Sequence, residues 1–180
     1  MNRCGEAYDE RLRQLAVVTA DSKGDREQID RSVRDVLQLA REHLGMDVAF
    51  VSKFVGGRRV FNAVEPSDGG EVIAEGDSEA LEASFCQRVI DGRLPGLVRD
   101  VAKFPGFAQL PSTPFPIGAH LSTAIILCDG TVYGTLCCFS FAPDESLRAR
   151  DLKRLRMAAD MVARLIDGAN RGENGAFLVD

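Results

Sequence analysis

Five cysteines are the residues of this sequence best suited to redox chemistry: Cys4, Cys86, Cys128, Cys137 and Cys138. A reactive thiolate requires partial exposure and a positive neighbourhood. Cys137 and Cys138 are adjacent, so on a strand they point to opposite faces and are poorly placed to form a bridge. We therefore expect five reduced thiols. Two interpretations stay open: Cys86 acts in redox chemistry with Cys137 or Cys138, or these side chains are small core hydrophobes.

The two histidines, His43 and His120, are the other candidates for chemistry. Zinc and haem sites need more ligands than the sequence supplies, so no metal site is predicted. His120 opens an apolar run that follows Pro116-Ile117-Gly118. It is either a polar contact to an acidic or carbonyl group of a ligand, or a histidine that is hydrogen-bonded at a strand end.

Helices are predicted near both ends of the chain, on either side of the segment that contains most of the cysteines and His120. Apolar residues recur at helical spacing over 6–18, 25–44 and 144–167. Gly45 is a suitable residue to end the second of these helices. Residues 168–180, which contain three glycines, are predicted to be a frayed tail.

Two β-hairpins are predicted between the helices, because Gly-Gly and Asp-Gly dipeptides join runs of β-forming residues. The paired strands are 48–55 with 58–64, and 119–127 with 131–141. The second pair is almost continuously apolar, which indicates central strands that are covered on both faces.

The segment between the hairpins is irregular. Ser78 is expected to cap a short helix that carries Phe85 and ends at Gly92. Five of the seven prolines lie in 94–116, which argues against regular structure there, apart from a short strand over 97–101. This segment is either a lid over a functional site or a surface connector.

These elements predict an α+β fold of the α/β-sandwich type. A central antiparallel sheet carries the N- and C-terminal helices on one face, and the short helix and the loop lid on the other. Irregular cover over an apolar sheet face favours a pocket. We divide the chain into an N-terminal helical extension (1–24), a domain (25–168) and a flexible tail (169–180).

This order of elements resembles the GAF family of sensor domains over about Arg26 to Asp167. The stretches that carry the resemblance are AHLSTAIILCDGTVYGTLCCFSF, DLKRLRMAADMVARLI and SFCQRVIDGRLPGLVRDVAKFP. Within the family, YGTLCCF is most similar to phytochrome-like domains and to sensor modules that precede cyclic-di-GMP enzymes. The segment STPFPIGAHLS has no Cys-His pair, so a covalent bilin is not expected, and the cofactor stays unknown.

The resemblance implies a small-molecule-binding regulatory domain, without catalysis of its own, that signals through a homodimer of its terminal helices to a downstream protein. One alternative is a redox-active domain that resembles the methionine sulfoxide reductases of this family. Those enzymes carry their cysteines in the lid, where this chain has none. The other alternative is a ligand-free dimerisation or interaction module.

Strand alternation and the expected lid together give a set of candidate ligand contacts, in which a few polar groups lie among apolar ones. They are Phe50, Ser52, Phe54, Phe85, Cys86, Val89, Phe104, His120, Ser122, Cys138 and Ser140. The same pattern also fits a solid core with polar strand ends.

Composition excludes several classes of partner. The net charge is −5, so the chain lacks the basic excess that nucleic-acid binding requires. No apolar run approaches the roughly 20 residues that span a bilayer. Charged residues occupy the N-terminus where a signal peptide would need an apolar stretch, so a cytoplasmic protein without a membrane partner is expected.

Overall fold

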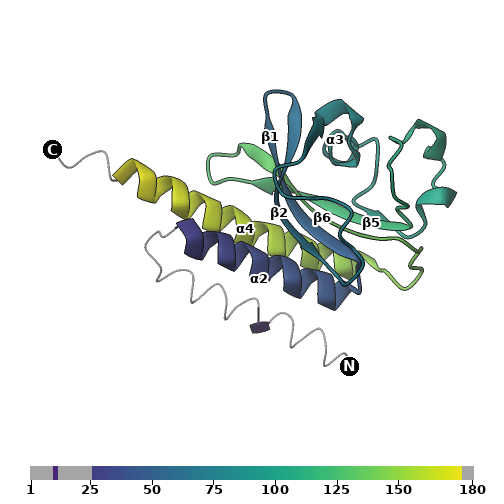
Figure 1. Cartoon of the computed structure of the whole chain (residues 1–180), viewed down its shortest axis with the longest axis horizontal. Coiled ribbons are helices and arrows are strands. Elements are labelled where there is room, and N and C mark those ends of the chain that lie inside the picture. Colours follow the sequence, from purple (N-terminus) through teal and green to yellow (C-terminus); the bar gives the residue numbers. More distant parts are fainter. Residues whose placement is uncertain (1–9, 12–25, 176–180) are drawn as a thin grey trace.

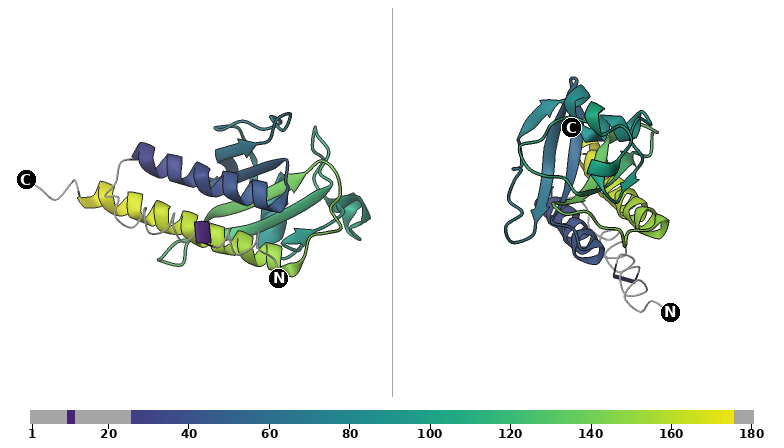
Figure 2. Two further views of the ribbon diagram at one scale, coloured as in Figure 1. Left: turned by 90° about the horizontal axis from the view of Figure 1, so that it is seen from below. Right: turned by 90° about the vertical axis from the view of Figure 1, so that its right-hand side faces the viewer.

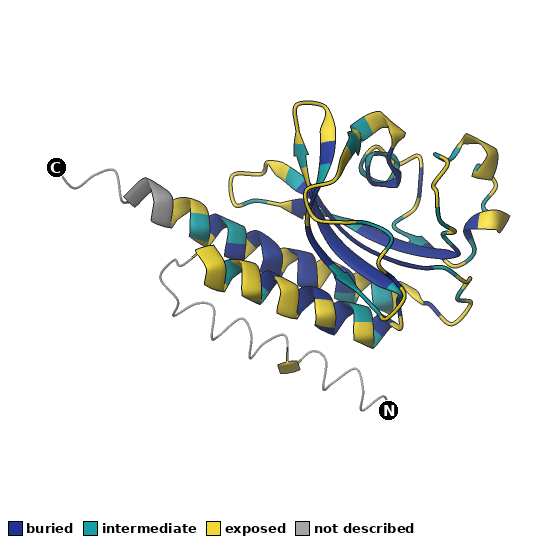
Figure 3. Ribbon diagram, viewed as in Figure 1, coloured by how far each residue is buried: buried dark blue, intermediate teal, exposed yellow. Residues whose placement is uncertain are grey.

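Two long helices lie side by side against one face of a β-sheet (Figure 1). Their apolar stripes form the core between helices and sheet. In this computed structural model, which describes residues 10–11 and 26–175, the helices are α2 (Arg26–Leu44) and α4 (Ala149–Gly175). Figure 2 shows them side by side from below. Their inward faces are buried and their outward faces are exposed (Figure 3).

Six antiparallel strands form the sheet in the order β3-β2-β1-β6-β5-β4. Their bounds are β1 Val48–Val55, β2 Arg58–Pro66, β3 Ser78–Ala80, β4 Leu97–Val98, β5 Ala119–Ile126 and β6 Val132–Ser140. The Gly56-Gly57 turn has positive φ at both residues, as the predicted hairpin requires. The predicted α+β sandwich with a central antiparallel sheet is thus confirmed.

Alternation along the central strands separates two cores. Leu136 and Cys138 of β6 pack toward the helices, whereas Cys137 and Phe139 pack toward the opposite side. On that side the cover is short and irregular: η1 (Leu81–Ala83), α3 (Phe85–Ile90), η2 (Val101–Lys103) and η3 (Phe107–Gln109). None of the helices in the described part of the chain combines the length and the apolarity that a membrane crossing requires.

The short helix begins later than predicted. Ser78 does not cap it, because residues 78–80 form β3 and pair with β2. The cap is Ser84, whose hydroxyl accepts a hydrogen bond from the backbone N–H of Gln87 at 3.1 Å. Sheet pairing at the edge strand thus overrides the capping preference of Ser78.

Ser84→Ala should lower the free energy of unfolding by about 1 kcal/mol, because it removes a buried cap of α3. Ser78→Ala is the matched control, since Ser78 is exposed and its loss should stay within about 0.5 kcal/mol. Urea denaturation of both variants measures the difference. An equal loss in the two variants would contradict the assignment of the cap.

The ends of the chain also differ from prediction. α4 begins at Ala149 rather than 144, because Asp144 accepts a hydrogen bond from the backbone N–H of Ser146 and so closes a local turn. The helix continues to Gly175, so the predicted tail is helical over 169–175. Of the predicted helix over 6–18 only Glu10 and Arg11 are described, both helical, and the rest lies outside the described residues.

Candidate functional site

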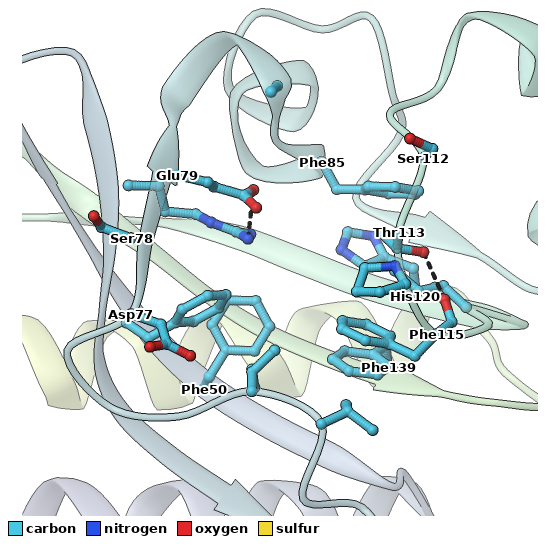
Figure 4. A pocket seen from close by; sticks show the side chains of 17 residues that line it. Phe50, Asp77, Ser78, Glu79, Phe85, Ser112, Thr113, Phe115, His120 and Phe139 are labelled. Atoms are coloured by element: carbon cyan, nitrogen blue, oxygen red, sulfur yellow. Dashed lines mark hydrogen bonds and ion pairs between the residues drawn. The ribbon is translucent and has the colours of Figure 1, made fainter.

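A cavity of about 310 Å³ lies on the sheet face opposite the two long helices. Its walls come from β1, β2, β5 and β6, from the chain around β3, and from the loop over 112–117. In Figure 4 the carboxylates of Asp77 and Glu79 lie at one end, and His120 and Phe115 lie at the other. The volume is at the small end of the range for ligand pockets, about 300–1,000 Å³, and suits a metabolite-sized molecule.

Phenylalanine side chains supply most of the apolar surface: Phe50, Phe61, Phe85, Phe115 and Phe139. The rings of Phe50 and Phe61 meet edge to face with centroids 5.0 Å apart. Phe115, from the loop, stacks on Phe139 of β6 at 5.5 Å. Such walls favour a ligand with a flat or compact apolar body.

Arg59 of β2 is the arginine that lines the cavity, and only 8% of its surface is exposed. Its guanidinium lies 4.4 Å from the centroid of the Phe61 ring and 2.6 Å from the carboxylate of Glu79. Nη1 donates to the sulfur of Cys86 at 3.1 Å. Burial by itself lowers the pKa of Arg59, but the negative charges of Cys86 and Glu79 outweigh it, so Arg59 stays a cation.

His120 lines the other end of the cavity and is almost fully buried beside Phe85, with ring centroids 5.3 Å apart. Burial, with a smaller contribution from the charge of Arg59, lowers its pKa to about 4. The imidazole is therefore neutral at pH 7, with one nitrogen that donates and one that accepts a hydrogen bond.

Two residues that line this cavity, Arg59 and His120, each contain a buried nitrogen atom with unmet hydrogen-bonding capacity. Among the residues that the structure describes, buried side-chain polar atoms without a partner include Nε of Arg59 and Nδ1 of His120. Leaving such a group buried and unpaired costs about 1–3 kcal/mol. A ligand with suitable polar atoms would remove that cost.

The structure brings together part of the predicted contact set. Phe50, Phe85 and His120 line the cavity. Ser52, Cys86 and Ser122 lie directly beneath it, in a buried cluster of hydroxyls and thiols.

The remaining predicted residues lie outside the cavity lining. Phe54, Val89 and Phe104 pack at the edges of the two apolar clusters on this side of the sheet. The candidate contact Cys138 packs toward the helices instead, because the residues of β6 that face the cavity side are Cys137 and Phe139. Ser140 turns its hydroxyl to the carbonyl of Ala142 at 2.6 Å.

Sequence reasoning missed an ion pair at one end of the cavity, Arg59 and Glu79. They lie on β2 and β3, the two strands at one edge of the sheet, where a charged residue usually faces water. The available signal was the alternation of Arg59 with Phe61 on β2, which places them on one face.

Comparison with known proteins places this geometry in a family. The family model described as "GAF domain" matches residues 28–166. No curated protein sequence matches the chain.

Solved structures share the fold at low sequence identity. The GAF domain of the Acinetobacter phosphoenolpyruvate-protein phosphotransferase superposes with a TM-score of 0.71 at 15% identity, over 95% of this chain and 97% of that one. The free methionine-R-sulfoxide reductase of Neisseria meningitidis, solved with its substrate, gives 0.69 at 14% identity over 95% and 94%. The chromophore-binding domain of a bacteriophytochrome from R. palustris gives 0.72 at 13% identity over 96% and 64%.

Proposed function

Since the chain belongs to the GAF domain family, whose model matches most of its length, we propose that it is a regulatory domain that binds a small ligand in the cavity beside Arg59 and His120. GAF domains are generally sensory and bind ligands, and most are not catalytic. The ligand has an apolar body and at least one acceptor oxygen, such as a carboxylate or an amide carbonyl.

The unpaired nitrogen atoms of Arg59 and His120, two residues of the cavity wall, carry this proposal. Nε of Arg59 is always a donor, so it calls for an acceptor on the ligand. Nδ1 of the neutral His120 is either a donor or an acceptor, and it calls for a polar group at the other end. The phenylalanine rings between them offer nothing polar, which suits the apolar body.

A route from the cavity to the helices supports a signalling role. The loop over 112–117 lines the cavity and continues into β5. Arg99, just after β4, donates from Nε to the carbonyl of Leu147 at 2.7 Å, immediately before α4 begins. The backbone of Asp144 donates to the carbonyl of Arg99. The backbone N–H of Val101, two residues after Arg99, donates to the carbonyl of Gly118, which directly follows the loop. A ligand that prefers one position of the loop therefore biases the start of α4 by a population shift.

We infer that the chain forms a homodimer through its terminal helices and that the shift changes this dimer. The dimer then passes the signal to a downstream protein. The apolar stripes of α2 and α4 are used against the sheet. Their exposed faces are mostly charged, with Met157 as an apolar residue on α4. A dimer on these faces would thus be held by polar contacts around a small apolar centre.

Three small probes that differ only in their polar group test the proposal: benzoate, benzamide and benzylamine. Calorimetry and thermal unfolding should show binding of benzoate and benzamide, which offer acceptor oxygens, and weaker or no binding of benzylamine. Arg59→Met should weaken benzoate binding by roughly 10-fold or more, because a hydrogen bond to a charged group contributes about 1.5–3 kcal/mol. Sedimentation velocity with and without benzoate measures whether the chain forms a dimer and whether the ligand changes the dimer.

The matched control is Arg34→Met, which removes an arginine that also pairs with a glutamate, Glu75, but lies on α2. It should leave benzoate affinity unchanged. The proposal is wrong if none of the three probes binds, or if Arg34→Met weakens binding as much as Arg59→Met does.

A further inference from the structure

Cys86 of α3 and Cys137 of β6 lie against each other behind the wall of the cavity. Their sulfur atoms are 3.5 Å apart, and both side chains are fully buried. A disulfide bond is about 2.05 Å long, so the two sulfurs must approach by roughly 1.5 Å to form one. Cys138 is the next residue along β6, but it packs on the helix side and is excluded from this pair.

The surroundings of the two sulfurs are different. Arg59 donates from Nη1 to Cys86, whereas Cys137 contacts the hydroxyls of Ser122 at 2.9 Å and Thr135 at 3.3 Å. Burial opposes ionisation of both thiols, but the hydrogen bond from Cys137 and the charge of Arg59 outweigh it at Cys86 and lower that pKa. Burial, together with the charge of Cys86, raises the pKa of Cys137. One sulfur is thus prepared as a thiolate and its neighbour stays a thiol.

We propose that Cys86 and Cys137 form a hydroperoxide-oxidised dithiol site, in which Cys86 is the attacking thiolate and Cys137 is the resolving thiol. Arg59 both contacts Cys86 and lines the cavity, so the cavity brings small molecules to within one side chain of the reacting sulfur. To reach Cys86 from the cavity a hydroperoxide must displace the Arg59 side chain, so the smallest one, hydrogen peroxide, is the expected oxidant.

The reaction has two steps that balance. The Cys86 thiolate attacks the terminal oxygen of the hydroperoxide: an S–O bond forms and gives a sulfenic acid, and the O–O bond breaks. The leaving alkoxide takes the proton that the Cys86 thiol released when it ionised, and becomes an alcohol, or water for hydrogen peroxide. Cys137 then attacks the sulfur of this sulfenic acid: the S–S bond forms and the S–O bond breaks. The leaving hydroxide takes the Cys137 proton and departs as water. Two thiols and one hydroperoxide give one disulfide, one alcohol and one water.

Mass spectrometry of the native full-length chain after hydrogen peroxide treatment tests the proposal. The expected result is the loss of two hydrogen atoms and a cross-linked peptide pair that joins Cys86 to Cys137. Cys137→Ser should stop at a sulfenic acid on Cys86, which dimedone traps. Cys138→Ser is the matched control: it replaces the neighbouring buried thiol on the other sheet face and should form the cross-link as the unchanged chain does.

Arg59 is tested as a positioning residue through the rate. We expect roughly tenfold slower oxidation in Arg59→Met, because the loss of thiolate outweighs the higher nucleophilicity of a more basic sulfur. Arg59→Lys keeps the positive charge and should recover most of the rate. The proposal is overturned if the unchanged native chain forms no Cys86–Cys137 cross-link under conditions that oxidise the denatured chain. That readout needs no variant to fold and no ligand to bind.

Discussion

Replacing Gly134 with alanine should destabilise the domain by about 3 kcal/mol or more, at the upper end of the cost of overpacking a core. Gly134 lies in β6 at the centre of the sheet, opposite Lys53 of β1 and Ile125 of β5. A Cβ at this position would stand 1.9 Å from the carbonyl oxygen of Ser52, which belongs to the backbone and has no rotamer to change. One of the central strands must therefore move.

The consequence should extend to the site. Ser52 shares a hydrogen bond of 2.7 Å with Thr135, the residue after Gly134, and a shift of β1 breaks the register of this buried pair. We expect Gly134→Ala to weaken probe binding as well as stability. Urea denaturation followed by circular dichroism measures the first effect, and calorimetry with benzoate measures the second.

Gly168→Ala is the control for the same chemical change without the clash. Gly168 lies in α4, and a Cβ there meets no atom within 4 Å. Alanine should stabilise a helix interior by about 0.5–1 kcal/mol relative to glycine. A Gly134→Ala variant whose stability lies within about 0.5 kcal/mol of the unchanged chain would contradict the close approach of β1 and β6.

Patterns that act over a few residues predicted the fold well. The helical stripe over 25–44 was placed within one residue of α2, because its periodicity and Gly45 act locally. Both hairpins followed from their turn dipeptides, since positive φ at Gly57 and Gly130 is a property of the turn itself. Competition between signals caused the errors, as at α3, where the capping preference of Ser78 lost to the pairing of β3 with β2 and the helix begins after Ser84 instead.

The site was predicted less completely because contacts between distant segments decide which residues line it. Alternation divides β6 into two sets, but only the packing of α4 decides that Cys138 faces the helices and Cys137 the cavity. The burial of Arg59 depends on Glu79 and Cys86, which lie 20 and 27 residues further along the chain. No local pattern indicates these partners, so Arg59 is absent from the contacts predicted from the sequence.

Acidification should destabilise the domain through His120 more than through an ordinary histidine. The pKa of His120 is lowered from 6.5 to about 4 in the folded chain, first by burial and then by the charge of Arg59. Between these two values the unfolded chain binds the proton and the folded chain does not, so stability falls as the pH falls. The contribution of His120 is fully present above pH 6.5 and is lost by about pH 4.

The size of the effect follows from the shift in pKa, which corresponds to about 3 kcal/mol at 1.36 kcal/mol for each unit. His120→Gln removes the titrating group, so it should lose about 3 kcal/mol less than the unchanged chain between pH 7 and pH 4. The difference between their two curves isolates His120 from the carboxylates, which titrate in both proteins. Urea denaturation at intervals across this range measures it.

A direct titration distinguishes this explanation from a general loss of structure at low pH. Proton resonances of the His120 ring, followed by NMR in the folded chain, should show no protonation near pH 6.5, where an exposed histidine titrates. Protonation of His120 at that pH would place water, rather than Phe85 and the sheet, around the ring. A neutral ring keeps one nitrogen that accepts and one that donates above about pH 5, so benzoate affinity should not change with the protonation of His120 between pH 6 and pH 8.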